Sequence, residues 1–138
     1  MNDRFKFRVW DSSANAYVTR SQFILLSDGT LIQEIGGEEV IWESTEPEFC
    51  TGLKDKNGKL IYEGDIVREV SIDEDSAMGA EFEEISVVCF GGGDYPYSFT
   101  LKHPRFYRGY ALLNYGYMRQ EIEIIGNIHE NADLLGEK

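Results

Sequence analysis

Residues 51–67 read TGLKDKNGKLIYEGDIV, and this stretch decides the predicted fold. Asn57-Gly58 is the strongest turn signal in the chain, because Asn and Gly tolerate the positive φ angles that a tight hairpin requires. Gly64-Asp65 predicts a second tight turn, in which the Asp65 carboxylate binds nearby backbone amides before a strand over 66–70. The stretch therefore predicts short antiparallel strands joined by tight turns.

The first strand expected upstream covers residues 4–10, whose sequence RFKFRVW alternates in character. A period of two places successive side chains on opposite faces of a strand. We expect one face to pack on the core with Phe5, Phe7 and Val9. The opposite, solvent face then carries Arg4, Lys6, Arg8 and Trp10.

Between these two stretches the sequence predicts a hairpin and a further strand. Residues 21–26 and 30–35 are rich in apolar side chains and flank Ser27-Asp28-Gly29, which has the composition of a tight turn. Gly36-Gly37 ends the second of these strands, and another is expected to begin over 39–42.

Downstream, the composition changes at residues 71–84, which contain six acidic and no basic side chains. Self-repulsion predicts a mobile surface loop or an extended hairpin tip there. Strands are expected over 85–90 and 121–125, the latter with Ile122 and Ile124 facing inward and Glu121 and Glu123 facing solvent. Asn131 is expected to cap a short helical turn over 132–135, with Gly136 past its end.

These patterns bound the fold class. The length of 138 residues fits a single domain, 1–138. Short strands at near-regular spacing, with Gly-rich turns and little helical periodicity, predict a mainly β protein. We expect one or two small SH3-like barrels of short antiparallel strands, followed by the C-terminal helical turn.

The charge balance restricts the partners. A formal net charge of −12 opposes general attraction to DNA, RNA or anionic lipid, so a nucleic-acid site would need a local basic patch. The first residues lack the apolar core of a signal peptide, and no run reaches the roughly 18 apolar residues of a membrane span. We therefore expect a cytoplasmic protein without membrane contact.

The two cysteines, Cys50 and Cys89, are far apart in sequence and have no Cys or His at metal-ligand spacing. Both lie in apolar surroundings, which favours buried free thiols. A disulfide and a shared metal stay open as alternatives.

Residues 6–11 read KFRVWD, and residues 124–131 read IIGNIHEN. Together with 51–67, and in this order, these blocks resemble the YopX family of bacteriophage and prophage proteins. The resemblance implies a mainly β, barrel-like protein of the bacterial host cell, an expectation of self-association, and no catalytic residues to carry over. Ala132 stands where the family has Pro, so the shape of the last turn stays open.

The aromatic and basic segment 95–119 holds eight aromatic and four basic side chains and no acidic one. Such residues are enriched at the centres of protein interfaces, can also stack on bases, or can fill a small β core. These three alternatives remain open. The residues expected to form an interaction surface are Tyr95, Tyr97, Arg105, Phe106, Tyr107, Arg108 and Tyr110.

Motifs for catalysis, cofactors or metals are weak throughout. His103 and His129 stand alone in sequence, and Gly91-Gly92-Gly93-Asp94 lacks the Lys-Ser/Thr of a phosphate loop. Glu121 and Glu123 have the spacing of solubilising residues on an exposed strand face. Asn127 and Asn131 are expected to fix local backbone. We therefore expect no enzyme activity, no cofactor and no metal.

Three functions follow from these features as hypotheses. The preferred one is a non-enzymatic interaction protein that forms homo-oligomers and contacts a phage or host protein. The first alternative is a nucleic-acid-binding module that uses the segment 95–119. The second is an acidic mimic of a polyanion, built on 73–84, that inhibits a host DNA-binding protein.

Overall fold

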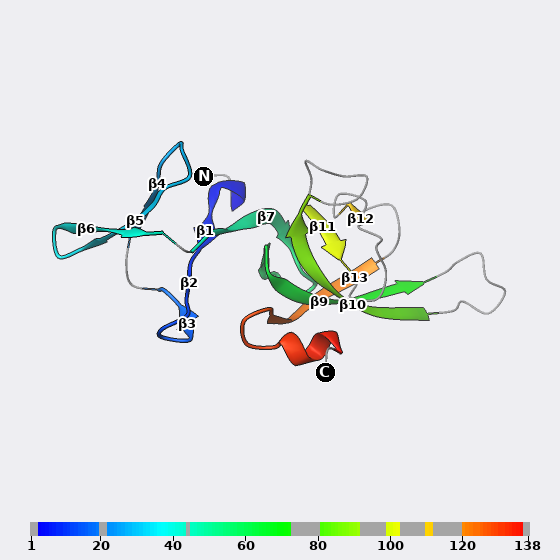
Figure 1. Cartoon of the computed structure of the whole chain (residues 1–138). Coiled ribbons are helices and arrows are strands. Elements are labelled where there is room, and N and C mark those ends of the chain that lie inside the picture. The colour runs from blue at the N-terminus through cyan, green and yellow to red at the C-terminus, as the bar shows by residue number, and fades with distance from the viewer. Residues whose placement is uncertain are drawn as a thin grey trace.

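The computed structural model describes residues 3–19, 22–43, 45–72, 81–91, 99–102, 110–111 and 120–136. The described structure is mainly β, as predicted, with antiparallel sheets and short 3-10 helices (Figure 1). Its elements in chain order are η1 (Asp3–Phe5), β1 (Phe7–Arg8), β2 (Trp10–Asp11), β3 (Ala16–Tyr17), β4 (Gln22–Leu25), β5 (Leu31–Ile35), β6 (Glu38–Trp42), β7 (Glu48–Lys54), β8 (Leu60–Tyr62), β9 (Asp65–Ile72), β10 (Glu81–Phe90), β11 (Phe99–Lys102), β12 (Tyr110–Ala111), β13 (Gln120–Asn127) and η3 (Ala132–Leu135).

The hydrophobic core lies on one face of a sheet with the strand order β12-β11-β10-β9-β13. Val67 on β9, Val88 on β10 and Ile122 on β13 are buried there, because alternation along each strand places every second side chain on this face. Ile61 on β8 packs against them. As expected, Ile122 faces inward, whereas Glu123 forms an outward ion pair.

The prediction of a closed barrel is wrong for the described part of the chain, where no strand pairing joins β12 to β13. Closure requires the first and last strands of a sheet to pair. The outer edge of β13 is used instead by the turn after β7. Lys56 N–H donates to the Ile122 carbonyl (2.9 Å), and Ile124 N–H donates to an Asp55 carboxylate oxygen (3.1 Å).

This turn between β7 and β8 confirms the Asn57-Gly58 signal. Gly58 has a φ of +81°, and the Asp55 carboxylate accepts the N–H groups of Asn57 and Lys59, each at 2.9 Å. Burial acts to raise the pKa of Asp55, but the N–H donors of Ile124, Lys59 and Asn57 outweigh it and lower the pKa. The charged Asp55 carboxylate therefore binds both the turn and β13, and so joins them.

The prediction of one strand over residues 4–10 is wrong. Residues 3–5 form η1, and Val9 separates β1 from β2. Phe5, expected in the core, is 67% exposed, whereas Trp10, expected at the surface, is buried. The physical reason is that Trp10 and Arg8 pack among aromatic rings, as described below.

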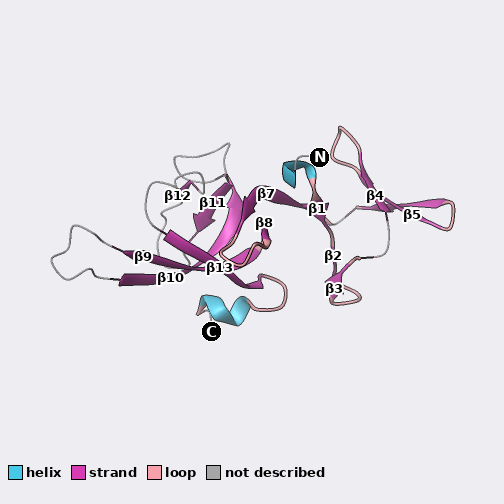
Figure 2. Cartoon of the chain, turned by 180° about the vertical axis from the view of Figure 1, so that it is seen from behind, coloured by secondary structure: helices cyan, strands magenta, loops and turns pink. Residues whose placement is uncertain are grey.

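The β4-β5-β6 sheet confirms the predicted hairpin and its following strand. Gly29 has a φ of +93°, and the Asp28 carboxylate accepts Thr30 N–H in the turn between β4 and β5. On one face the Phe23 and Trp42 rings lie edge to face at 5.5 Å, and Trp42 Nε1 donates to Gln33. Figures 1 and 2 show this sheet at the opposite end of the molecule from the β9–β10 hairpin.

The predicted acidic segment 71–84 begins and ends in paired strands, because Ile72 on β9 lies opposite Glu81 on β10. Of residues 73–84, on which the polyanion-mimic hypothesis depends, 73–80 lie outside the described residues.

At the C-terminus, η3 and Gly136, with a φ of +73°, lie where a helical turn was predicted. The predicted side-chain cap is wrong, because the Asn131 side chain makes no cap bond and accepts Asn127 N–H instead. The two cysteines are free, as predicted; Cys50 is buried and Cys89 is half-buried. Within the described ranges, no helix has the length and apolar character needed to cross a membrane.

Candidate functional site

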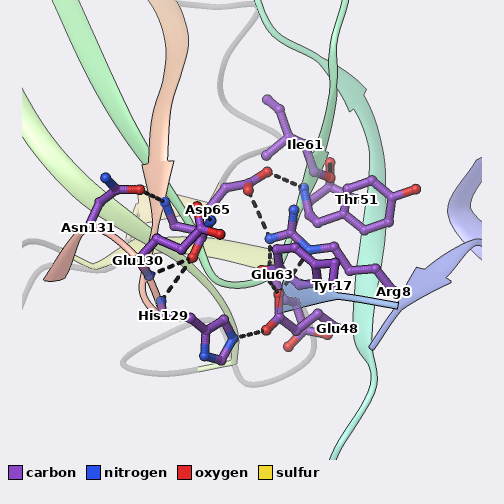
Figure 3. A network of polar contacts seen from close by, with 12 residues as sticks. Arg8, Tyr17, Glu48, Thr51, Ile61, Glu63, Asp65, His129, Glu130 and Asn131 are labelled. Carbon is purple, nitrogen blue, oxygen red and sulfur yellow. Dashed lines mark hydrogen bonds and ion pairs between the residues drawn. The ribbon is translucent and has the colours of Figure 1, made fainter. Parts of the chain in front are cut away.

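The densest polar cluster of the described structure lies where β1, β7, β9 and the turn after β13 meet (Figure 3). We call it the Arg8 cluster. Its members are Arg8, Trp10, Tyr17, Glu48, Asp65 and His129.

Arg8 is the centre of this cluster. Its Nε donates to Glu48 Oε1 (2.9 Å), and its Nη2 donates to Asp65 Oδ1 (2.8 Å) and to the Glu63 carbonyl (3.0 Å). The register of β1 with β7 sets Arg8 directly opposite Glu48, so the first of these bonds follows from strand pairing.

Asp65 is placed by the Glu63-Gly64 turn that begins β9. Its Oδ2 accepts Tyr62 N–H at 2.8 Å, which confirms the predicted role of its carboxylate in binding nearby amides. The side chain is only 3% exposed. Burial raises the pKa of Asp65 even though Tyr62 N–H and the Arg8 guanidinium act to lower it. A carboxylate in this position needs its cation.

Aromatic rings enclose the guanidinium. Arg8 Cζ lies 4.3 Å from the centre of the Tyr17 ring and 4.9 Å from that of Tyr62. Tyr17 also donates its hydroxyl to Glu48 Oε1 (2.8 Å), and burial together with this bond raises the pKa of the phenol, so it stays a donor.

His129 closes the cluster from the C-terminal side. Its ring stacks on Trp10 with a centroid distance of 4.4 Å and an interplanar angle of 6°, and its Nε2 lies 2.5 Å from Glu48 Oε2. The preceding turn is held by Asn127, whose side-chain oxygen accepts the N–H groups of His129 and Glu130. This confirms the predicted backbone role of Asn127.

The arrangement explains what the cluster does. Glu48 lies 40 residues from Arg8 and 81 from His129, so these contacts hold together distant parts of the chain. Residues 6–11, 51–67 and 124–131, the three blocks that carry the family resemblance, each contribute at least one member. The charged and titratable side chains of the cluster bind one another. Contacts of this kind stabilise the arrangement of the strands, which is a structural role.

Gly64 tests how tightly the cluster is packed. A Cβ at this position would lie 2.9 Å from Glu48 Oε1, and the φ of +83° strains any L side chain. We expect Gly64→Ala to lower the free energy of unfolding by about 2–3 kcal/mol. The matched control is Gly58→Ala, with a φ of +81° and no atom within 4 Å, which is expected to cost about 1 kcal/mol. Urea unfolding measures both losses. Equal losses would show that the Glu48 side chain moves away from the added methyl group without an energetic cost.

A second buried carboxyl lies on the core face of the large sheet. Glu69 on β9 is 5% exposed and lies opposite Ile122 on one side and Glu84 on the other. Its carboxylate has no hydrogen bond or ion pair among the residues that the structure describes. Burial first, and then the charge of Glu84, raise its pKa to about 7. No sequence signal distinguished this residue.

Exposed apolar side chains gather on the β4-β5-β6 sheet. Ile24, Ile32 and Ile41 lie opposite one another in register and form a row across one face, which we call the isoleucine row. Ile24 is 42% and Ile41 57% exposed. Glu34 and Glu39 form the neighbouring row on the same face. The prediction of a hairpin over 21–26 and 30–35 did not include that both faces of the sheet carry apolar side chains.

The predicted interaction surface cannot be placed on this structure. Of Tyr110, only the backbone position in β12, opposite Leu101, is described. His103, which is not a member of that surface but was named among the candidate metal ligands, also lies outside the described residues. The remaining members, Tyr95, Tyr97, Arg105, Phe106, Tyr107 and Arg108, also lie outside them.

In the part of the chain that the structure describes, no group of three or more His, Cys, Asp or Glu side chains could hold a metal ion. Glu123, one of the paired acids of the predicted strand, binds Arg68 (2.6 Å) and Lys56 (3.4 Å) instead.

Comparison with known proteins gives a similar structure and a family for this chain. It is similar to a solved structure, that of protein EF1440 from Enterococcus faecalis, with 25% sequence identity and a TM-score of 0.55 over 94% of this chain and 96% of that one. No curated protein is found to match. The family model described as YopX protein matches residues 6–136, and the chain therefore belongs to the YopX family.

Proposed function

We propose that this protein is a non-enzymatic interaction protein that self-associates through its β4-β5-β6 sheet. The observation that carries the proposal is where its exposed apolar side chains lie. Of the nine large ones in the described part of the chain, five belong to this sheet and its turn: Ile24, Leu26, Ile35, Val40 and Ile41. Ile24 and Ile41 lie on one face of the sheet and Ile35 and Val40 on the other. A small sheet with exposed apolar side chains on both faces indicates a contact site, because contact with another chain removes apolar area from water.

The Arg8 cluster supports the same proposal. Arg8, Glu48 and His129 are polar groups gathered in one place, and each is held by partners within the cluster. Their mutual contacts favour a rigid scaffold, from which the β4-β5-β6 sheet extends for contact with another chain (Figure 2).

Light scattering coupled to size-exclusion chromatography tests the proposal. We expect the mass of the wild-type protein to rise from one chain toward two as its concentration increases, and Ile24→Lys to shift it back to one chain. The control is Ile128→Lys, since Ile128 is 39% exposed but lies in the turn after β13. A wild-type protein that stays monomeric at every concentration contradicts self-association.

A further inference from the structure

The two edges of the β4-β5-β6 sheet differ in charge. β6 carries Glu38 and Glu39, both exposed, and charged side chains of this kind oppose pairing with another strand. β4 has the sequence QFIL, without charge, proline or bulge. Among the described residues its backbone pairs only with β5, so one side of β4 presents unpaired N–H and carbonyl groups. Such an edge is a template for another strand.

We propose that β4 pairs with β4 of a second copy of this chain, antiparallel, so that two three-stranded sheets become one continuous sheet. The inference rests on the proposed self-association and names the strand that makes it. The occupant is a second copy because the uncharged β4 offers an identical strand of matching hydrogen-bonding groups and apolar side chains.

Symmetry restricts the register of this pairing. A twofold axis perpendicular to the sheet keeps each face on its own side, so a residue lies opposite itself or one an even number of positions away. An axis at Phe23 would place polar Gln22 opposite Ile24. An axis at Ile24 places Ile24 opposite itself and Phe23 opposite Leu25, which makes every pair within the strand apolar and continues the isoleucine row into the second copy.

Electrostatics favours this edge contact over stacking of the two faces. Glu34 and Glu39 lie on the same face as the isoleucine row. Stacking two copies through this face would bring this acidic row close to acids of the other copy. In the edge-paired sheet, the two copies of β5 are three strand spacings apart, roughly 14 Å. This exceeds the Debye length of about 8 Å at physiological salt, so the repulsion between the Glu34 side chains is screened.

Cysteine cross-linking tests the register. In an antiparallel pair, residues directly opposite have Cα atoms about 4.5–5.5 Å apart, which suits a disulfide. We expect Ile24→Cys to form a disulfide-linked dimer under mild oxidation. Gln22→Cys is the matched control on the same strand, because its two copies would be offset by about four residues, roughly 13 Å. The wild-type protein reports any background from Cys50 and Cys89.

A second variant separates edge pairing from face stacking. Ile41 lies on β6, about two strand spacings from the proposed join, so Ile41→Lys is expected to keep the wild-type dimer in light scattering. Loss of the dimer in Ile41→Lys, or a dimeric wild type with no cross-link in Ile24→Cys, overturns the edge inference and leaves self-association standing. A wild-type protein that is monomeric throughout overturns both proposals.

Discussion

Replacing Arg8 by leucine is expected to lower the free energy of unfolding by about 3–5 kcal/mol, the cost of removing one partner of a buried ion pair. The substitution leaves Asp65, which is 3% exposed, and Glu48 without their cation. Leucine retains apolar contact with the Tyr17 and Tyr62 rings, so the loss reports mainly the unpaired charges. Urea unfolding followed by tryptophan fluorescence measures it, because Trp10 lies within the cluster.

Two further variants identify the cause. Lys6→Leu removes a neighbouring but exposed ion pair with Asp3, and we expect a far smaller loss, because solvent screens exposed charges. Adding Asp65→Asn to Arg8→Leu removes the orphaned charge while keeping an oxygen for Tyr62 N–H, so stability should partly recover. A loss in Arg8→Leu no larger than that in Lys6→Leu would show that the cluster does not stabilise the fold.

The turns of this fold could be predicted from the sequence because their causes are local. Gly58 and Gly29 supply the positive φ of the two turns. Asp55 and Asp28 supply the carboxylates that bind the turn amides, each within a few residues of its glycine. Gly64-Asp65 follows the same rule. The strands next to these turns were predicted for the same reason, since the turns fix where each strand begins and ends.

The Arg8 cluster could not be predicted in this way, because its contacts depend on which distant strands become neighbours. Alternation alone assigns Arg8 to a solvent face, but a guanidinium can stack on aromatic rings while it pairs with carboxylates. His129 stands alone in sequence and meets Glu48 only in the fold. The usable signal was that each family-like block contains a charged or titratable residue: Arg8, Asp65 and His129.

The failed barrel prediction has a similar origin. Periodicity of two indicates strands, but it does not tell whether the last strand pairs with the first or with something else. Here the Asp55 carboxylate and Lys56 N–H occupy the edge of β13, and neither contact has a local signal. The Asn57-Gly58 turn was predicted correctly, but its second role, which is to cover that edge, was not.

Lowering the pH from about 7.5 to about 4.5 is expected to relieve a destabilising charge at Glu69. The pKa of this buried carboxyl is raised from 4.5 to about 7, so the folded state binds the proton more tightly than the unfolded state does. The contribution of Glu69 to the free energy of unfolding is therefore most favourable below the pKa of the unfolded state. This contribution is lost as the pH rises through the pKa of the folded state. A shift of this size corresponds to on the order of 3 kcal/mol.

The test is the difference between the pH dependence of the wild type and that of Glu69→Gln, because Glu63 and Asp65 also have raised pKa values and remain in both proteins. Urea midpoints between pH 4.5 and 7.5 should fall with rising pH more steeply in the wild type. Glu123→Gln is the control of opposite sign: bonding to Arg68 and Lys56 lowers the pKa of Glu123, so its stabilisation is lost as the pH falls. Parallel pH profiles for the wild type and Glu69→Gln would mean that the Glu69 carboxyl is solvated in the folded protein, and its position between Ile122 and Glu84 would then carry no energetic cost.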